Sequence, residues 1–111
     1  TSMPLLTLRC KENSWQAYVF GISPKADRES ELATARLRFD KTEVLTLKMV
    51  RVVGDDALFF RRPIEIIRTM MNHGQLLFRF TTADSDRLTA TFNLRGLSKA
   101  LEPLREECDW E

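Results

Sequence analysis

Apolar and polar residues alternate with a period of two along most of this chain, a pattern typical of strands that bury one face. The clearest run is Ala33–Phe39, where apolar positions alternate with threonine and arginine. The same alternation occurs in Leu76–Thr81 and Leu88–Leu94, on either side of a cluster of turn formers, Ala83–Asp86. Because turn-forming residues between two alternating runs favour a tight connection, these runs predict a β-hairpin.

Further alternating runs lie at the start and in the middle of the chain. Leu6–Cys10 and Trp15–Val19 flank a turn at Lys11–Ser14, and the first run places its cysteine on the inner face. A long run, Thr42–Val53, ends at Gly-Asp-Asp and is followed by a short strand at Ala57–Phe60. The pattern therefore predicts about seven strands.

Two segments change to a period near 3.6, which indicates helices. The first begins at Pro63 and stops at Asn-His-Gly, with Ile64, Ile67 and Met71 on one side. In the second, Pro103 removes one backbone donor, so we expect a kink or a division into two short turns. Its apolar stripe consists of Leu97, Leu101, Leu104 and Cys108. The predicted fold is α+β, mainly an antiparallel sheet or β-sandwich of about seven strands with two short helices.

Length and charge limit the classes of function. The 111 residues carry 17 basic and 16 acidic side chains, a formal net charge of +1. A chain of this length forms one domain, residues 1–111, with one core. Because the net charge is near zero, no whole-chain field attracts nucleic acid or an anionic membrane. The longest apolar stretches are far shorter than a membrane span. We therefore expect a soluble domain that neither spans a membrane nor binds nucleic acid.

The two cysteines, Cys10 and Cys108, lie near opposite ends of the chain. A bond between them would close nearly the whole domain into one loop, which stabilises by about 4 to 5 kcal/mol in the chain-entropy model. Disulfides persist in oxidising compartments, so this interpretation predicts an exported, periplasmic or extracellular protein. The alternative is two free thiols buried as small apolar side chains. Residues 1–3 are interpretable as a cloning remnant, in which case a targeting segment or anchor preceded them.

Catalytic and metal-binding patterns are absent from the sequence. The one histidine, His73, lies at a predicted helix end, where its charge would complement the helix dipole. One histidine and two remote cysteines do not supply a zinc site, and the glycines are too isolated for a phosphate-binding loop. The paired carboxylates Asp55-Asp56 and Glu106-Glu107 fall in a turn and at a helix end, where solvated carboxylates are ordinary. We predict no catalytic residues, no metal and no cofactor.

Two charged segments are candidates for binding a partner. Arg61-Arg62 follows Phe59-Phe60 and forms the one basic and aromatic cluster. A nucleic-acid site would need these arginines beside exposed aromatic rings. The alternative has one phenylalanine in the core and the arginines paired with Asp55, Asp56 or Glu65. The second segment is a solvated loop, Gly21–Glu31, with candidate binding residues Ser23, Lys25, Asp27, Arg28 and Glu29.

The run Leu88–Trp110 resembles the end of the VasI or TagO family of type VI secretion system-associated proteins. In that family a strand ending in Phe and a Gly-Leu turn lead into an Ala-Leu-x-Pro-Leu-Arg helix and a Cys-x-Trp ending, as in Phe92–Trp110. The opening Leu6–Cys10, and a second strand containing Tyr18-Val19, are similar to the family's first cysteine strand. The resemblance covers roughly Leu5 to Trp110, while Trp15 and the loop Ser23–Glu31 depart from the pattern.

The resemblance implies a non-enzymatic accessory protein of the cell envelope, located in the periplasm, that binds a protein of the secretion apparatus or the cell wall. Sheet edges are a common binding mode in such domains, because their backbone groups can accept another strand. The alternative is an inhibitor or immunity protein that binds a cell-wall hydrolase, a task that suits small disulfide-linked β domains. A hydrolase acting through Asp55 and Asp56 is the third and weakest hypothesis. Nothing in the sequence indicates an oligomeric state.

Overall fold

The computed structural model describes residues 4–26, 31–52 and 56–108. These residues contain seven strands and three short helices. The strands are β1 (Leu5–Lys11), β2 (Ser14–Phe20), β3 (Leu32–Phe39), β4 (Leu45–Val52), β5 (Ala57–Phe59), β6 (Gln75–Thr81) and β7 (Arg87–Asn93). The helices are α1 (Pro63–Met71), α2 (Leu97–Ala100) and α3 (Glu102–Glu107).

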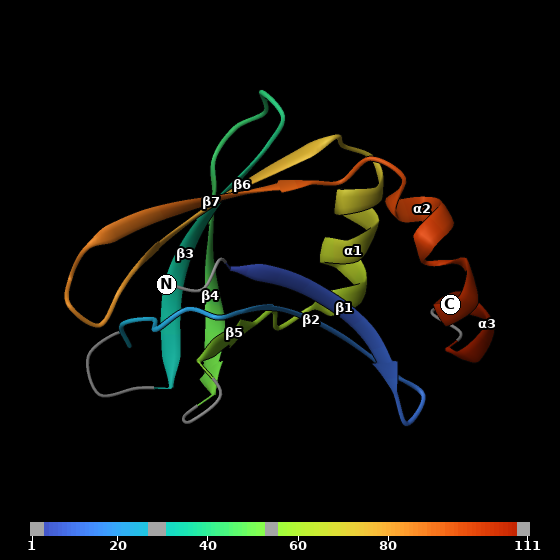
Figure 1. Cartoon of the computed structure of the whole chain (residues 1–111), viewed down its shortest axis with the longest axis horizontal. Helices are drawn as coiled ribbons and strands as arrows, with labels where there is room; N and C mark the ends of the chain where they lie inside the picture. The colour runs from blue at the N-terminus through green and yellow to red at the C-terminus, as the bar shows by residue number, and fades with distance from the viewer. Residues whose placement is uncertain (1–3, 27–30, 53–55, 109–111) are drawn as a thin grey trace.

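All seven strands join one antiparallel sheet in the order β1-β2-β5-β4-β3-β6-β7. The sheet curls into a half-barrel, and α1 lies between the arm formed by β1 and β2 and the arm formed by β6 and β7 (Figure 1). The predicted α+β class is therefore confirmed, as a single curved sheet rather than two stacked sheets.

Turn chemistry sets the register of the hairpins. Lys11 pairs with Ser14, so β1 and β2 are joined by a two-residue turn in which Glu12 and Asn13 have φ values of 53° and 61°. A turn of this kind needs positive φ at both central residues, which asparagine tolerates well. The resulting register places Trp15, Ala17 and Val19 on the buried face of β2, as their alternation predicts.

The core lies on the concave face of the sheet, where α1 packs against it. The largest fully buried side chains include Leu37 and Phe39 of β3 and Phe78 of β6. The predicted alternation of these two strands is confirmed. In α1 the buried residues are Ile66, Ile67 and Met70, whereas Ile64 and Met71 are only partly buried. The prediction that Ile67 faces the core was therefore correct, but Ile66 and Met70 are more buried than the predicted Ile64 and Met71.

The carboxyl-terminal segment forms α2 and α3 instead of one helix, so the division expected at Pro103 is confirmed. Pro103 lies in the first turn of α3, where the missing N–H breaks no intrahelical bond. Cys108 follows α3, is fully buried, and forms a disulfide with the half-buried Cys10 of β1, 98 residues earlier. The predicted bond is present, with the two Cα atoms 6.0 Å apart.

Candidate partner-binding groove

A break in the sheet creates the candidate site. β5 is only three residues long and pairs with β4 at Val50, Arg51 and Val52. After Phe59 the chain leaves the sheet, and Pro63 begins α1 because its fixed φ and missing N–H suit a first helical turn. The first half of β4 consequently has β3 on one side and, among the described residues, no paired strand on the other.

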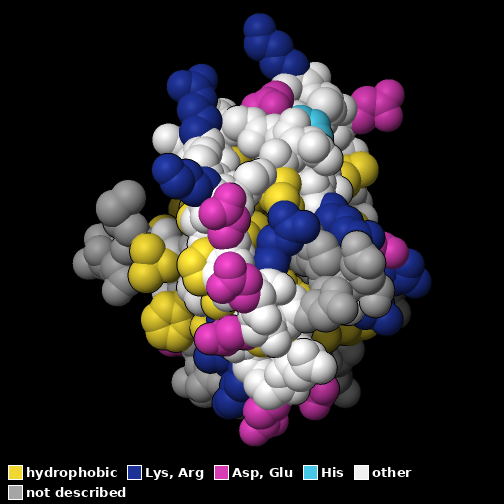
Figure 2. Space-filling model, turned by 90° about the vertical axis from the view of Figure 1, so that its right-hand side faces the viewer, with side chains coloured by type: hydrophobic (Ala, Val, Ile, Leu, Met, Phe, Trp, Pro, Cys, Tyr) yellow, Lys and Arg dark blue, Asp and Glu magenta, His cyan; other side chains and the backbone are white. Residues whose placement is uncertain are grey.

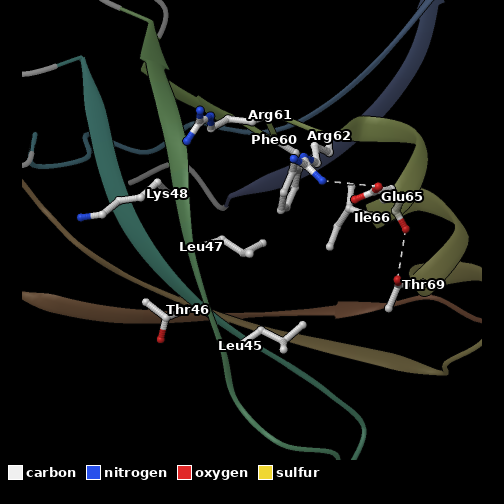
Figure 3. A pocket seen from close by; sticks show the side chains of 10 residues that line it. All are labelled: Leu45, Thr46, Leu47, Lys48, Phe60, Arg61, Arg62, Glu65, Ile66 and Thr69. Carbon is white, nitrogen blue, oxygen red and sulfur yellow. Dashed lines mark hydrogen bonds and ion pairs between the residues drawn. The ribbon is translucent and has the colours of Figure 1, made fainter.

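A groove of about 520 Å³ occupies this break, between β4 and α1. Its apolar side chains come from both elements and from the segment that joins β5 to α1. Figure 3 shows Leu45 and Leu47 of β4 pointing toward α1, and Ile66 of α1 on the opposite wall beside Phe60. The other lining residues are Thr46, Lys48, Arg61, Arg62, Glu65 and Thr69.

The floor of the groove is core-facing surface that no other part of the described chain covers. Leu45, Leu47 and Met49 lie on one face of β4, as the alternation predicts. Met49 is fully buried, Leu47 is partly exposed, and Leu45 is 43% exposed. Apolar exposure therefore increases along the strand away from β5. Large apolar side chains left accessible in a row are typical of a binding surface.

The backbone of β4 is directed suitably for another strand. The N–H of Arg51 donates to the carbonyl of Glu31 across the β3–β4 pair, at 2.7 Å. In an antiparallel pair of strands, every second residue directs its N–H and C=O toward the partner strand. Met49 and Leu47 therefore also bond toward β3. Thr46 lies between two such residues, so its N–H and C=O point away from β3, toward the side that β5 leaves open.

The mouth of the groove carries more positive than negative charge. Arg61 and Arg62 are exposed, and the Nη1 of Arg62 lies 3.7 Å from the Oε1 of Glu65. Lys48 points away from the groove, to the convex face, where its Nζ donates to the Oγ1 of Thr34 at 2.6 Å (Figure 3). The predicted pairing of an arginine with Glu65 is confirmed. An exposed ion pair of this kind contributes little stability, so Arg61 and Arg62 can still attract a partner of opposite charge.

The two phenylalanines before the arginines lie in different environments. Phe60 is 6% exposed and packs edge-on against Phe78, whereas Phe59 lies on the convex face, stacked on Tyr18 with ring centroids 4.4 Å apart. The two rings thus point to opposite faces of the sheet. This arrangement agrees with the interpretation in which one phenylalanine belongs to the core.

The predicted loop residues lie elsewhere. The carbonyl of Ser23 accepts from Ala83, and Lys25 donates from its backbone N–H to Thr81 and from its Nζ to Ser85. These bonds fix the start of the loop to the β6–β7 hairpin, on the far side of β4 and β3 from Arg61 and Arg62 (Figure 1). The loop was expected to be solvated, but Ile22 and Pro24 are buried there. Asp27, Arg28 and Glu29 lie outside the described residues.

No group of three His, Cys, Asp or Glu side chains in residues 4–26, 31–52 and 56–108 is placed to hold a metal ion. In the same ranges, no helix has the length and apolarity needed to cross a bilayer. His73 follows α1, and its Nδ1 lies 2.8 Å from the carbonyl of Thr69, a contact within the end of the helix.

Comparisons with known proteins identify a family and a fold. The model of the family described as Type VI secretion system VasI, EvfG matches residues 2–110. Among solved structures, the chain is similar to the crystal structure of invasion associated protein b from Bartonella henselae, with a TM-score of 0.65 and 12% identity. The similarity covers 95% of this chain and 75% of that one, and at this identity it shows the fold alone. A search of curated proteins finds no match.

Proposed function

This chain belongs to the type VI secretion system VasI/EvfG family, and on that premise we propose that it is a non-enzymatic accessory protein of the cell envelope. It acts by binding a protein of the secretion apparatus, and the groove between β4 and α1 receives an extended segment of that partner. The observation that carries this proposal is the half-paired β4, whose backbone and apolar side chains are both directed into the groove.

Strand addition explains why these two features occur together. A peptide that pairs with β4 gains main-chain hydrogen bonds at Thr46, while every second side chain enters the groove. There it meets Leu45, Leu47 and Ile66. Arg61 and Arg62 stand at the mouth, so the favoured segment alternates apolar residues and carries a carboxylate at the end near these arginines.

The disulfide supports a location outside the cytoplasm. A bond between Cys10 and Cys108 persists where the environment is oxidising, and the family is associated with an envelope-spanning machine. We therefore place the protein in the periplasm. Its partner would be a periplasmic part of the apparatus, or a protein attached to the cell wall beside it.

A single substitution tests the mode of binding. Thr46→Pro removes the N–H that points into the groove, and leaves the β3–β4 hydrogen bonds in place because those use the neighbouring residues. Thr46→Val is the matched control, since it keeps the N–H and the β-branched shape. With a photo-crosslinking residue at Leu45, both variants are expressed in the source bacterium and the crosslinked proteins are identified by mass spectrometry.

The expected result is a crosslink to one component of the secretion apparatus, kept in Thr46→Val and lost in Thr46→Pro. Equal crosslinking in both variants would show that the partner does not pair with β4. Recovery of a cell-wall hydrolase in place of an apparatus component would favour the inhibitor function instead. Circular dichroism of the purified variants confirms that each remains folded.

A further inference from the structure

The convex face of the sheet is strongly basic even though the whole chain is nearly neutral. None of the seven strands contains Asp or Glu. The basic residues whose strand positions place them on the convex face are Arg9, Lys11, Arg36, Arg38, Lys48, Arg79 and Arg87. By contrast, acidic and basic side chains are interspersed on the helical end of the molecule (Figure 2). The net charge of +1 is therefore distributed unevenly, with an excess of basic residues on the convex face.

Three of these arginines converge on one hollow. Arg36 of β3 and Arg79 of β6 are directly opposite each other, and Arg87 of β7 lies two pairs further along the β6–β7 ladder, opposite Thr81. They line a cavity of about 210 Å³ together with Thr34, Phe80 and Thr81. Within the part of the chain that the structure describes, no carboxylate contributes to this lining.

The positive charge of the hollow is not neutralised within the described residues. None of Arg36, Arg79 and Arg87 forms an ion pair there, and Arg79 donates from its Nε to the Oγ1 of Thr89, at 3.3 Å. Like charges directly opposite each other on a sheet are unfavourable unless something negative lies between them.

We propose that this hollow, defined by Arg36, Arg79 and Arg87, binds a phosphate group. Guanidinium groups match phosphate oxygens with paired N–H donors, and three that converge suit an anion carrying more than one negative oxygen. The hydroxyl of Thr81 lines the same cavity and supplies a further donor. The phosphate is carried either as a small soluble anion or by the headgroups of an anionic lipid surface. This site is separate from the β4 groove and does not depend on it.

The test compares two charge-matched double variants, Arg36→Gln/Arg79→Gln in the hollow and Arg61→Gln/Arg62→Gln at the groove. Inorganic phosphate is titrated while backbone amide shifts are followed by NMR. Vesicles of phosphatidylcholine, with and without phosphatidylglycerol, are then tested by co-sedimentation at two salt concentrations. A short DNA duplex serves as a third probe. Thermal melting establishes that both variants fold.

Saturable shifts at the three strands with inorganic phosphate would support the proposal and identify a soluble anion as a sufficient ligand. Salt-sensitive binding to the phosphatidylglycerol vesicles, without a phosphate response, would support it with the lipid surface as the source. In either case the hollow variant binds more weakly by about fivefold for each arginine removed, and the groove variant is unchanged. Binding to neither probe, binding to DNA alone, or equal loss in both variants would overturn it.

Discussion

Removal of the disulfide is the change with the largest effect predicted from this structure. The bond joins β1 to the end of α3, and the two cysteines are separated by 98 residues. The chain-entropy model assigns a loop of that length about 4.7 kcal/mol of stabilisation through restriction of the unfolded chain. Since a small domain has a total stability of about 5 to 15 kcal/mol, loss of the bond removes a large part of it.

The assay uses Cys10→Ala, Cys108→Ala and the double variant, melted with and without reductant. For a domain of this size, each kcal/mol corresponds to about 4 °C, so the oxidised protein should melt about 15 to 20 °C above each variant. Alanine is chosen because Cys108 is fully buried and serine would place a hydroxyl group there. Reductant should lower the melting temperature of the unaltered protein and leave the variants unchanged.

The pattern among the variants is as informative as the size of the effect. Either single substitution breaks the whole bond, so the double variant should lose little more than each single one. Independent, additive losses would indicate that the two sulfurs act only as separate packing groups. Equal melting of the oxidised and reduced protein would refute the reasoning directly, together with the stabilisation calculated from the loop.

Three further substitutions test particular contacts by urea denaturation. Phe78→Ala empties a fully buried position beside Phe60 and should cost about 3 to 5 kcal/mol. Asp40→Ala removes the carboxylate that accepts from the N–H groups of Gly74 and Gln75, and should cost about 1 to 2 kcal/mol. Arg79→Thr should increase stability by about 0.2 to 1 kcal/mol, because it removes the charge opposite Arg36; a clear loss would contradict the like-charge argument.

The parts of the fold that depend on local pattern could be predicted from the sequence. The alternation in Ala33–Phe39 correctly identified the buried face of β3, and Pro103 correctly indicated the division into α2 and α3. Both predictions rest on neighbours within a few residues. The structural role of Asp40 was not predicted. In the structure it has a φ of 52°, and its carboxylate accepts from Gly74 and Gln75, which are more than thirty residues away in the sequence.

The candidate site depends on long-range pairing, which the sequence pattern does not specify. Leu45 and Leu47 were placed on the correct face, but alternation alone assigns such residues to the core. Their exposure results from the length of β5, which ends before it can cover the first half of β4. The phosphate-binding hollow has the same origin: Arg36 and Arg79 are far apart in sequence and become opposite neighbours only when β3 pairs with β6.

The short β5 connects the packing of the core to the proposed binding mode. If β5 continued along β4 for several more residues, it would cover Leu45 and Leu47, but Pro63 could not then begin α1 where Ile66 and Ile67 now pack on the sheet. An open strand edge is a liability for aggregation, and proteins usually protect it with charge or cover it. Here Arg61 and Arg62 flank the edge and repel the same edge of a second copy, while still attracting a segment of opposite charge. The charges that would select the partner would therefore also disfavour pairing of this edge with a second copy.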